Sequence, residues 1–88
     1  MPEAYEVQFE RKAQKRLDGL VGADYDRLEQ AIDALAFDPR PRGCVKLKGR
    51  QPTWRIRVGE YRVLYAVFDA DKLVKILDVV RRSGQTYR

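Results

Sequence analysis

The side chains of this sequence best suited to chemistry are arginines in its second half. Arg55 and Arg57 alternate with apolar residues, so they project side by side from one face of a predicted strand. Arg62 can lie one strand away, and Arg81 and Arg82 end the last apolar run. A guanidinium donates two parallel hydrogen bonds to a phosphate, and a cluster without carboxylates is self-repulsive until it binds a polyanion. The spacing therefore predicts a phosphate-binding cluster.

Part of this cluster also has a purely structural explanation. Arg55 and Arg57, taken alone, would fit the solvated face of an antiparallel sheet. Arg62, however, interrupts the nearly continuous apolar run 61–68, where an unpaired charge is costly. That interruption favours the functional interpretation. Aromatic residues among the arginines could stack on unpaired bases, although Trp54 and Tyr65 fit the core better; the four are Trp54, Tyr61, Tyr65 and Tyr87.

Composition removes several classes of chemistry. The 88 residues contain no histidine and a single cysteine, Cys44, which excludes Ser-His-Asp and Cys-His catalysis, histidine-metal sites and an internal disulfide. We therefore expect neither a metal nor a cofactor. The length fits one domain over residues 1–88, and no apolar run is long enough to cross a membrane.

Charge is divided unevenly along the chain. Residues 1–39 carry a net charge of −4 and residues 40–88 a net charge of +9, which together make the overall +5. A basic excess confined to one half predicts a strongly positive face and an anionic partner.

The periodicity of apolar residues predicts the elements that position the arginines. A short strand over residues 5–9 precedes an amphipathic helix that ends near Gly19, and a second helix begins at Asp24 as N-cap and stops before Asp38. A connector over residues 38–52 leads to three strands at 53–58, 61–68 and 73–80. The predicted fold is α+β in the order β-α-α-β-β-β, an antiparallel sheet with two helices packed on one face.

Three segments carry a resemblance to a known family. They are Leu47-Lys48-Gly49, the run from Trp54 to Tyr65 with its Gly-Glu-Tyr-Arg-Val-Leu-Tyr core, and Val79-Val80-Arg81-Arg82 with Tyr87-Arg88. Together with the opening strand and helix, these segments resemble the RelE branch of the RelE/ParE toxin superfamily over essentially the whole chain. The predicted order of elements matches that family's fold.

The resemblance implies a toxin of a type II toxin–antitoxin system that cleaves messenger RNA in the ribosomal A site. It also implies a cognate antitoxin as partner, in a toxin–antitoxin hetero-oligomer, and a cytoplasmic protein with no membrane partner. Arg55 and Arg57 match two basic family positions that are often lysine, Arg62 matches the arginine of the Tyr-Arg core, and Arg82 and Tyr87 match the C-terminal arginine and tyrosine. An acidic or amphipathic antitoxin segment would dock on the helices or a sheet edge.

On this resemblance, the expected reaction is attack of the RNA's own 2′-hydroxyl on the adjacent phosphate. We expect Arg62 and Arg82 to clamp the scissile phosphate, Arg57 to act with them, and Tyr87 to be the candidate base. Further phosphate contacts would come from five basic residues: Arg55, Arg57, Arg81, Lys48 and Arg50. Arginine stays protonated and is a poor base, so the proton-transfer roles stay open.

Two other functions remain open. A ParE-type toxin of the same fold acts on DNA gyrase, a mode that needs no phosphate clamp. A non-enzymatic RNA- or ribosome-binding module, or a toxin that has lost its activity, would use the same basic face without forming product.

Overall fold

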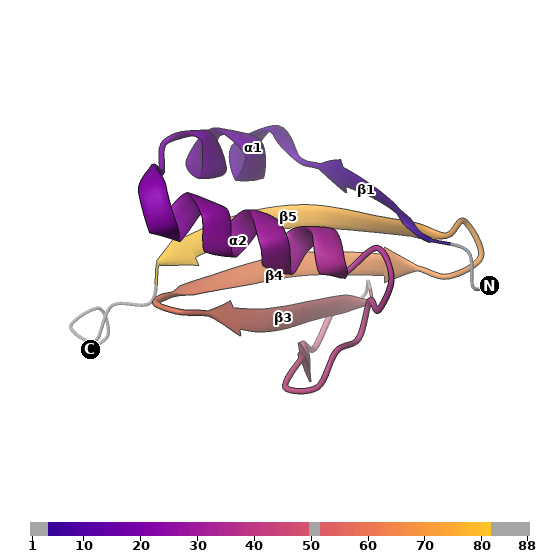
Figure 1. Ribbon diagram of the computed structural model, residues 1–88. Coiled ribbons are helices and arrows are strands. Elements are labelled where there is room, and N and C mark those ends of the chain that lie inside the picture. Colours follow the sequence, from indigo (N-terminus) through magenta and orange to yellow (C-terminus); the bar gives the residue numbers. More distant parts are fainter. Residues whose placement is uncertain (1–3, 50–51, 82–88) are drawn as a thin grey trace.

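Two helices and five strands make up the part of the chain that the computed structural model describes, residues 4–49 and 52–81 (Figure 1). The elements are β1 (Glu6–Phe9), α1 (Arg11–Asp18), α2 (Gly22–Ala34), β2 (Val45–Lys46), β3 (Thr53–Val58), β4 (Tyr61–Phe68) and β5 (Leu73–Arg81). No helix in these two ranges is both long and apolar enough to cross a membrane.

The strands form one sheet in the order β1-β5-β4-β3-β2. Strands β2 to β5 pair antiparallel, whereas β1 runs parallel to β5 along its outer edge. The α+β fold and the order of its main elements are confirmed, but the sheet is mixed and not wholly antiparallel. The pairing of β1 with β5 ends at Phe9, opposite Ile76. Helix α1 begins two residues later and packs against β5. The predicted connector 38–52 contains one further strand, the two-residue β2.

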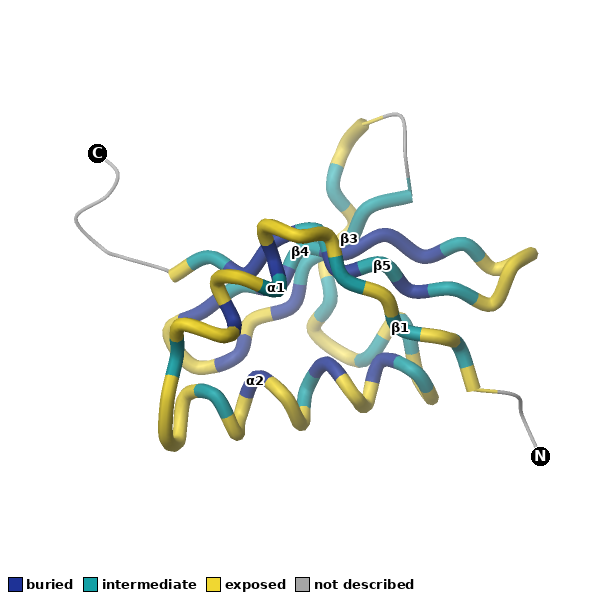
Figure 2. Tube along the Cα trace, turned by 90° about the horizontal axis from the view of Figure 1, so that it is seen from above, coloured by how far each residue is buried: buried dark blue, intermediate teal, exposed yellow. Residues whose placement is uncertain are grey.

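Both helices bury an apolar stripe in a single core. In α1 the buried residues are Ala13 and Leu17, and in α2 they are Leu28 and Ile32, each pair spaced four residues apart on one helix face. Figure 2 shows these buried positions of α2 recurring on the side that faces the strands. The N-cap prediction is wrong by three residues: the capping position is Val21, without a side-chain cap, and Asp24 lies in the first turn, where a carboxylate suits the helix dipole.

The sheet contributes the other half of this core through alternate residues of three strands. These are Ile56 and Val58 of β3, Tyr61, Val63, Tyr65 and Val67 of β4, and Val74, Ile76 and Val79 of β5. Tyr65 is fully buried, and its hydroxyl donates a 2.8 Å hydrogen bond to the Pro39 carbonyl. The prediction that Tyr65 belongs to the core is confirmed. The alternation that buries these residues sends their sequence neighbours to the opposite face of the sheet, which we call the open face.

The β3–β4 turn fixes how the two central strands align. Gly59 has φ +61° at the first central position of a two-residue hairpin turn, where positive φ favours glycine. The resulting register places Arg57 directly opposite Arg62.

A β-bulge changes which face of the sheet the last side chains of β5 occupy. Leu64 pairs with Asp78 and Tyr65 with Ile76, so Leu77 is the extra residue. Beyond the bulge, Val79 pairs with Val63 on the core face, and Val80 pairs with Arg62 on the open face. One inserted residue therefore reverses which side chains of β5 reach the open face.

Candidate functional site

Three of the predicted phosphate-binding arginines lie together on the open face. Arg57 of β3 and Arg62 of β4 are cross-strand partners, and Arg55 is the partner of Leu64, which lies two residues beyond Arg62. Directly opposed side chains in an antiparallel pair are about 5 Å apart at Cβ. The predicted proximity of Arg55, Arg57 and Arg62 is confirmed by this register.

These three arginines, the open-face arginines, have no countercharge in the part of the chain that the structure describes. None of them takes part in an ion pair or a side-chain hydrogen bond with residues 4–49 or 52–81. Arg62 is half-buried, and its Nε is inaccessible to solvent without a hydrogen-bond partner. Two opposed cations repel each other, and an unpartnered buried donor costs about 1–3 kcal/mol. An anion bound at Arg57 and Arg62 would reduce their mutual repulsion and would give Arg62 Nε an acceptor.

The nearby acids that could have neutralised the open-face arginines are bound elsewhere. Asp78 is buried and forms ion pairs with Arg16 at 3.1 Å and Lys12 at 3.5 Å, both on α1. Glu60, in the β3–β4 turn, pairs with Arg81 at 3.1 Å. Lys12 and Arg16 thus bind the end of β5, a role that sequence analysis did not foresee.

The remaining predicted site residues are not part of this cluster. Arg81 pairs in register with Tyr61, on the core side of the strand, and its hydrogen bond to Glu60 raises its pKa. The structure therefore does not bring Arg81 to the open-face arginines, because the bulge turns it away. Lys48 is exposed two residues after β2. Arg50, Arg82 and Tyr87 lie outside the described residues.

Three of the four aromatic residues predicted as possible stacking surfaces lie within the described residues, and all three face the core. Tyr61 and Tyr65 are buried on the core face. Trp54 faces the same side and packs against the core, with Arg40 and Lys46 over its ring at 5.4 and 5.8 Å. The preferred interpretation of Trp54 as a core residue is confirmed, and its alternation with Arg55 was the signal for it.

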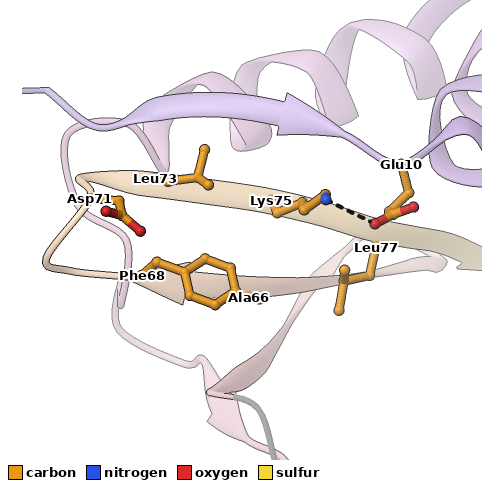
Figure 3. Close-up of a pocket in the computed structure, with 7 residues that line it drawn as sticks. All are labelled: Glu10, Ala66, Phe68, Asp71, Leu73, Lys75 and Leu77. Carbon is orange, nitrogen blue, oxygen red and sulfur yellow. Dashed lines mark ion pairs between the residues drawn. The ribbon is translucent and has the colours of Figure 1, made fainter.

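A hollow on the open face went unnoticed in the sequence. It measures about 290 Å³ and lies toward the β4–β5 turn, as Figure 3 shows. Its seven lining residues are Glu10, Ala66, Phe68, Asp71, Leu73, Lys75 and Leu77. The signal was that the open-face positions of β4 and β5 are also mostly apolar, as the nearly continuous apolar run 61–68 shows.

The described residues bring no three acidic or cysteine side chains together in a metal-binding arrangement. Cationic donors aimed at one place on a sheet can instead bind phosphate groups and stabilise negative charge that develops on them.

Comparison with known proteins agrees with this architecture. The profile of a family described as the ParE toxin of type II toxin–antitoxin systems, parDE, matches residues 7–86. The chain belongs to the RelE/ParE toxin superfamily. It is accordingly a toxin of a type II toxin–antitoxin system, and the predicted resemblance is confirmed.

Individual members of the superfamily are similar along most of their length. A Methanocaldococcus jannaschii protein that bears the name toxin RelE1 is 28% identical over 83 residues, which cover 91% of this chain and 92% of the relative. In the archaeal RelE–RelB complex from Pyrococcus horikoshii, a chain with 35% identity superposes with a TM-score of 0.82, covering 91% of this chain and 97% of that one. The isolated Escherichia coli RelE toxin shares the fold, with a TM-score of 0.79 at 24% identity, covering 91% of this chain and 86% of that one.

Proposed function

We propose that this toxin is a metal-independent endoribonuclease that cleaves messenger RNA on the ribosome. The observation that carries the proposal is the opposed pair Arg57 and Arg62, whose charges lack a protein partner within the described residues and whose Arg62 Nε is buried without an acceptor. A phosphate oxygen is the acceptor that this arrangement fits best.

The reaction uses a nucleophile that the substrate supplies. The 2′-oxygen attacks the adjacent phosphorus and loses its proton, and the bond from phosphorus to the 5′-oxygen breaks. The products are a 2′,3′-cyclic phosphate and a 5′-hydroxyl, which takes up a proton. Negative charge grows on the non-bridging oxygens at the transition state, and donors already aimed at them lower the barrier.

In this proposal Arg62 and Arg82 hold the scissile phosphate, and Arg55 and Arg57 hold it and its neighbours. Tyr87 is the candidate base; its ordinary pKa of about 10 must fall in a cationic surrounding for it to act near neutral pH. The lesser phosphate contacts are proposed for Lys48 and Arg50, and no longer for Arg81, which lies on the core side and pairs with Glu60.

The test compares Arg62→Ala with Arg11→Ala, which removes the same charge from the exposed first residue of α1. On ribosomes programmed with a defined message, Arg62→Ala should lower the single-turnover cleavage rate by about 100-fold or more, while its urea midpoint stays near that of the wild type. Arg11→Ala should cleave normally, and the wild-type product should carry a 2′,3′-cyclic phosphate. Full cleavage by Arg62→Ala would refute the assigned role.

We further propose a cognate antitoxin as the binding partner. The similar Pyrococcus horikoshii chain was solved in a RelE–RelB complex, and the basic half of this chain suits an acidic or amphipathic partner segment. Co-expression with a short neighbouring gene should rescue growth and yield a complex that co-purifies.

Inhibition of DNA gyrase is the second candidate, favoured by the ParE description of the matching family. The two activities separate cleanly after induction in cells: message cleavage supports the nuclease, whereas DNA damage with intact messages supports the gyrase inhibitor. Salt-dependent ribosome binding without either outcome would leave a binding module.

A further inference from the structure

The hollow and the open-face arginines lie on the same face of the sheet. Residues 62, 64, 66 and 68 of β4 alternate onto the same face, so Arg62 stands at one end of this row and Phe68 at the other. Ala66 and Phe68 line the hollow. Four residues of strand separate Ala66 from Arg62, which is about 13 Å. A strand of RNA held at Arg62 and running along β4 would therefore carry a neighbouring base over the hollow.

The lining of the hollow fits a base better than a phosphate. Phe68, Leu73 and Leu77 provide an aromatic ring and apolar surface, all on one side of the sheet (Figure 3). At the rim stand the carboxylates of Glu10 and Asp71, and Glu10 forms a 3.2 Å ion pair with Lys75. Carboxylates repel a phosphate, but they accept hydrogen bonds from the exocyclic amino group of a base.

We propose that this hollow is a nucleobase subsite, in which Phe68 stacks on a base of the same RNA strand whose phosphates the open-face arginines bind. The proposal rests on the proposed function and adds a source of sequence preference to it. The rim carboxylates favour a base with an exocyclic amino group, which adenine, cytosine and guanine have, over uracil, which has none.

The test places an abasic nucleotide at each position of the codon and its neighbours in turn. The message carries a 2′-deoxy substitution at the attacking position, so that the affinity of the toxin for programmed ribosomes is measured without cleavage. At one position the abasic substitution should weaken wild-type binding by about 5-fold to 150-fold, the range of base–aromatic stacking.

Phe68 is then varied against the same set of messages. Phe68→Leu keeps the apolar volume but loses the ring, and it should bind the intact and abasic messages equally at that position. Phe68→Tyr keeps the ring and should keep the difference. Asp71→Asn should reduce the preference for the three amino-bearing bases over uracil there. Arg62→Ala should weaken binding to every message by the same factor.

The outcomes separate this subsite from the nuclease. If no position shows an abasic loss that depends on Phe68, the subsite is refuted even when cleavage is normal. If the Phe68-dependent loss appears but the wild type cleaves no natural message, the subsite stands and the proposed nuclease fails. If Phe68→Leu weakens only the antitoxin complex, the hollow binds protein and the proposal is overturned.

Discussion

At the scale of single residues, Asp69 joins three separate segments of the chain. It accepts a 2.6 Å hydrogen bond from the Tyr5 hydroxyl and forms a 2.6 Å ion pair with Arg40, whose guanidinium also lies over the Trp54 ring. Arg40 and then Tyr5 lower the pKa of the Asp69 carboxyl below 3.8. These contacts tie the β4–β5 turn to the N-terminal strand and to the connector after α2.

This lowered pKa predicts how stability responds to acid. A carboxylate with a depressed folded-state pKa stabilises the fold above its unfolded-state pKa, and that contribution is lost as the pH falls through the folded-state value. Asp69→Asn should therefore lower the urea midpoint at neutral pH and flatten its decline on acidification below about pH 4. The control is Asp71→Asn in the same turn, which should retain the wild-type decline. Identical acid dependence in both variants would contradict the prediction.

At the scale of elements, the bulge in β5 lies beside a contact with α1. The bulge residue Leu77 precedes Asp78, which is held by Lys12 and Arg16 of α1 and also accepts a 2.8 Å hydrogen bond from the Val79 amide. This contact anchors the first helix to the strand that ends beside Arg62. The bulge in turn decides that Val80, and not Arg81, is the cross-strand partner of Arg62.

Removing the charge of Asp78 should therefore cost stability. Asp78→Asn keeps the shape of the side chain but loses both ion pairs, and we expect the free energy of unfolding to fall by about 1–2 kcal/mol. This is less than a fully buried pair would lose, because Lys12 and Arg16 are more than half exposed. Glu60→Gln breaks the exposed pair with Arg81 and should cost less than about 1 kcal/mol. Urea denaturation measures the loss of stability in each variant. Equal losses in Asp78→Asn and Glu60→Gln would contradict the prediction that the more buried carboxylate contributes more.

At the scale of the whole molecule, α2 and the open-face arginines carry opposite charges on opposite sides of the sheet. The exposed acids of α2 lie on the helix that covers the core face, whereas the open-face arginines lie on the other side of the sheet. One molecule thus carries a negative helix surface and a positive sheet surface, which orients an approaching polyanion toward the arginines.

Salt dependence should report how many phosphates this surface binds. Each phosphate contact on a single strand contributes about −0.7 to the slope of log affinity against log salt. Arg57→Ala should therefore make the slope shallower by about 0.7 for binding to a programmed ribosome, while Arg11→Ala on the exposed side of α1 should leave it unchanged. An unaltered slope in Arg57→Ala would mean that this side chain contacts no phosphate in the complex.

Local patterns in the sequence determined most of the elements and half of the site. Alternation around Trp54 predicted that Arg55 and Arg57 share a face, and the short Gly59-Glu60 turn predicted that Arg62 returns beside them. These inferences hold because side-chain direction in a strand and the register of a tight hairpin are set by a few neighbouring residues.

Contacts between distant segments decided the rest. The parallel pairing of β1 with β5 and the ion pairs of Asp78 with α1 join residues more than sixty positions apart. The place of Arg81 at the end of the last apolar run predicted that it lies near the cluster. The bulge at Leu77 reverses which face the later side chains of β5 reach, and it turns Arg81 away. The sequence around the bulge residue Leu77 does not reveal the bulge, because its position is set by the pairing of β5 with β4 and by the contacts of β5 with α1.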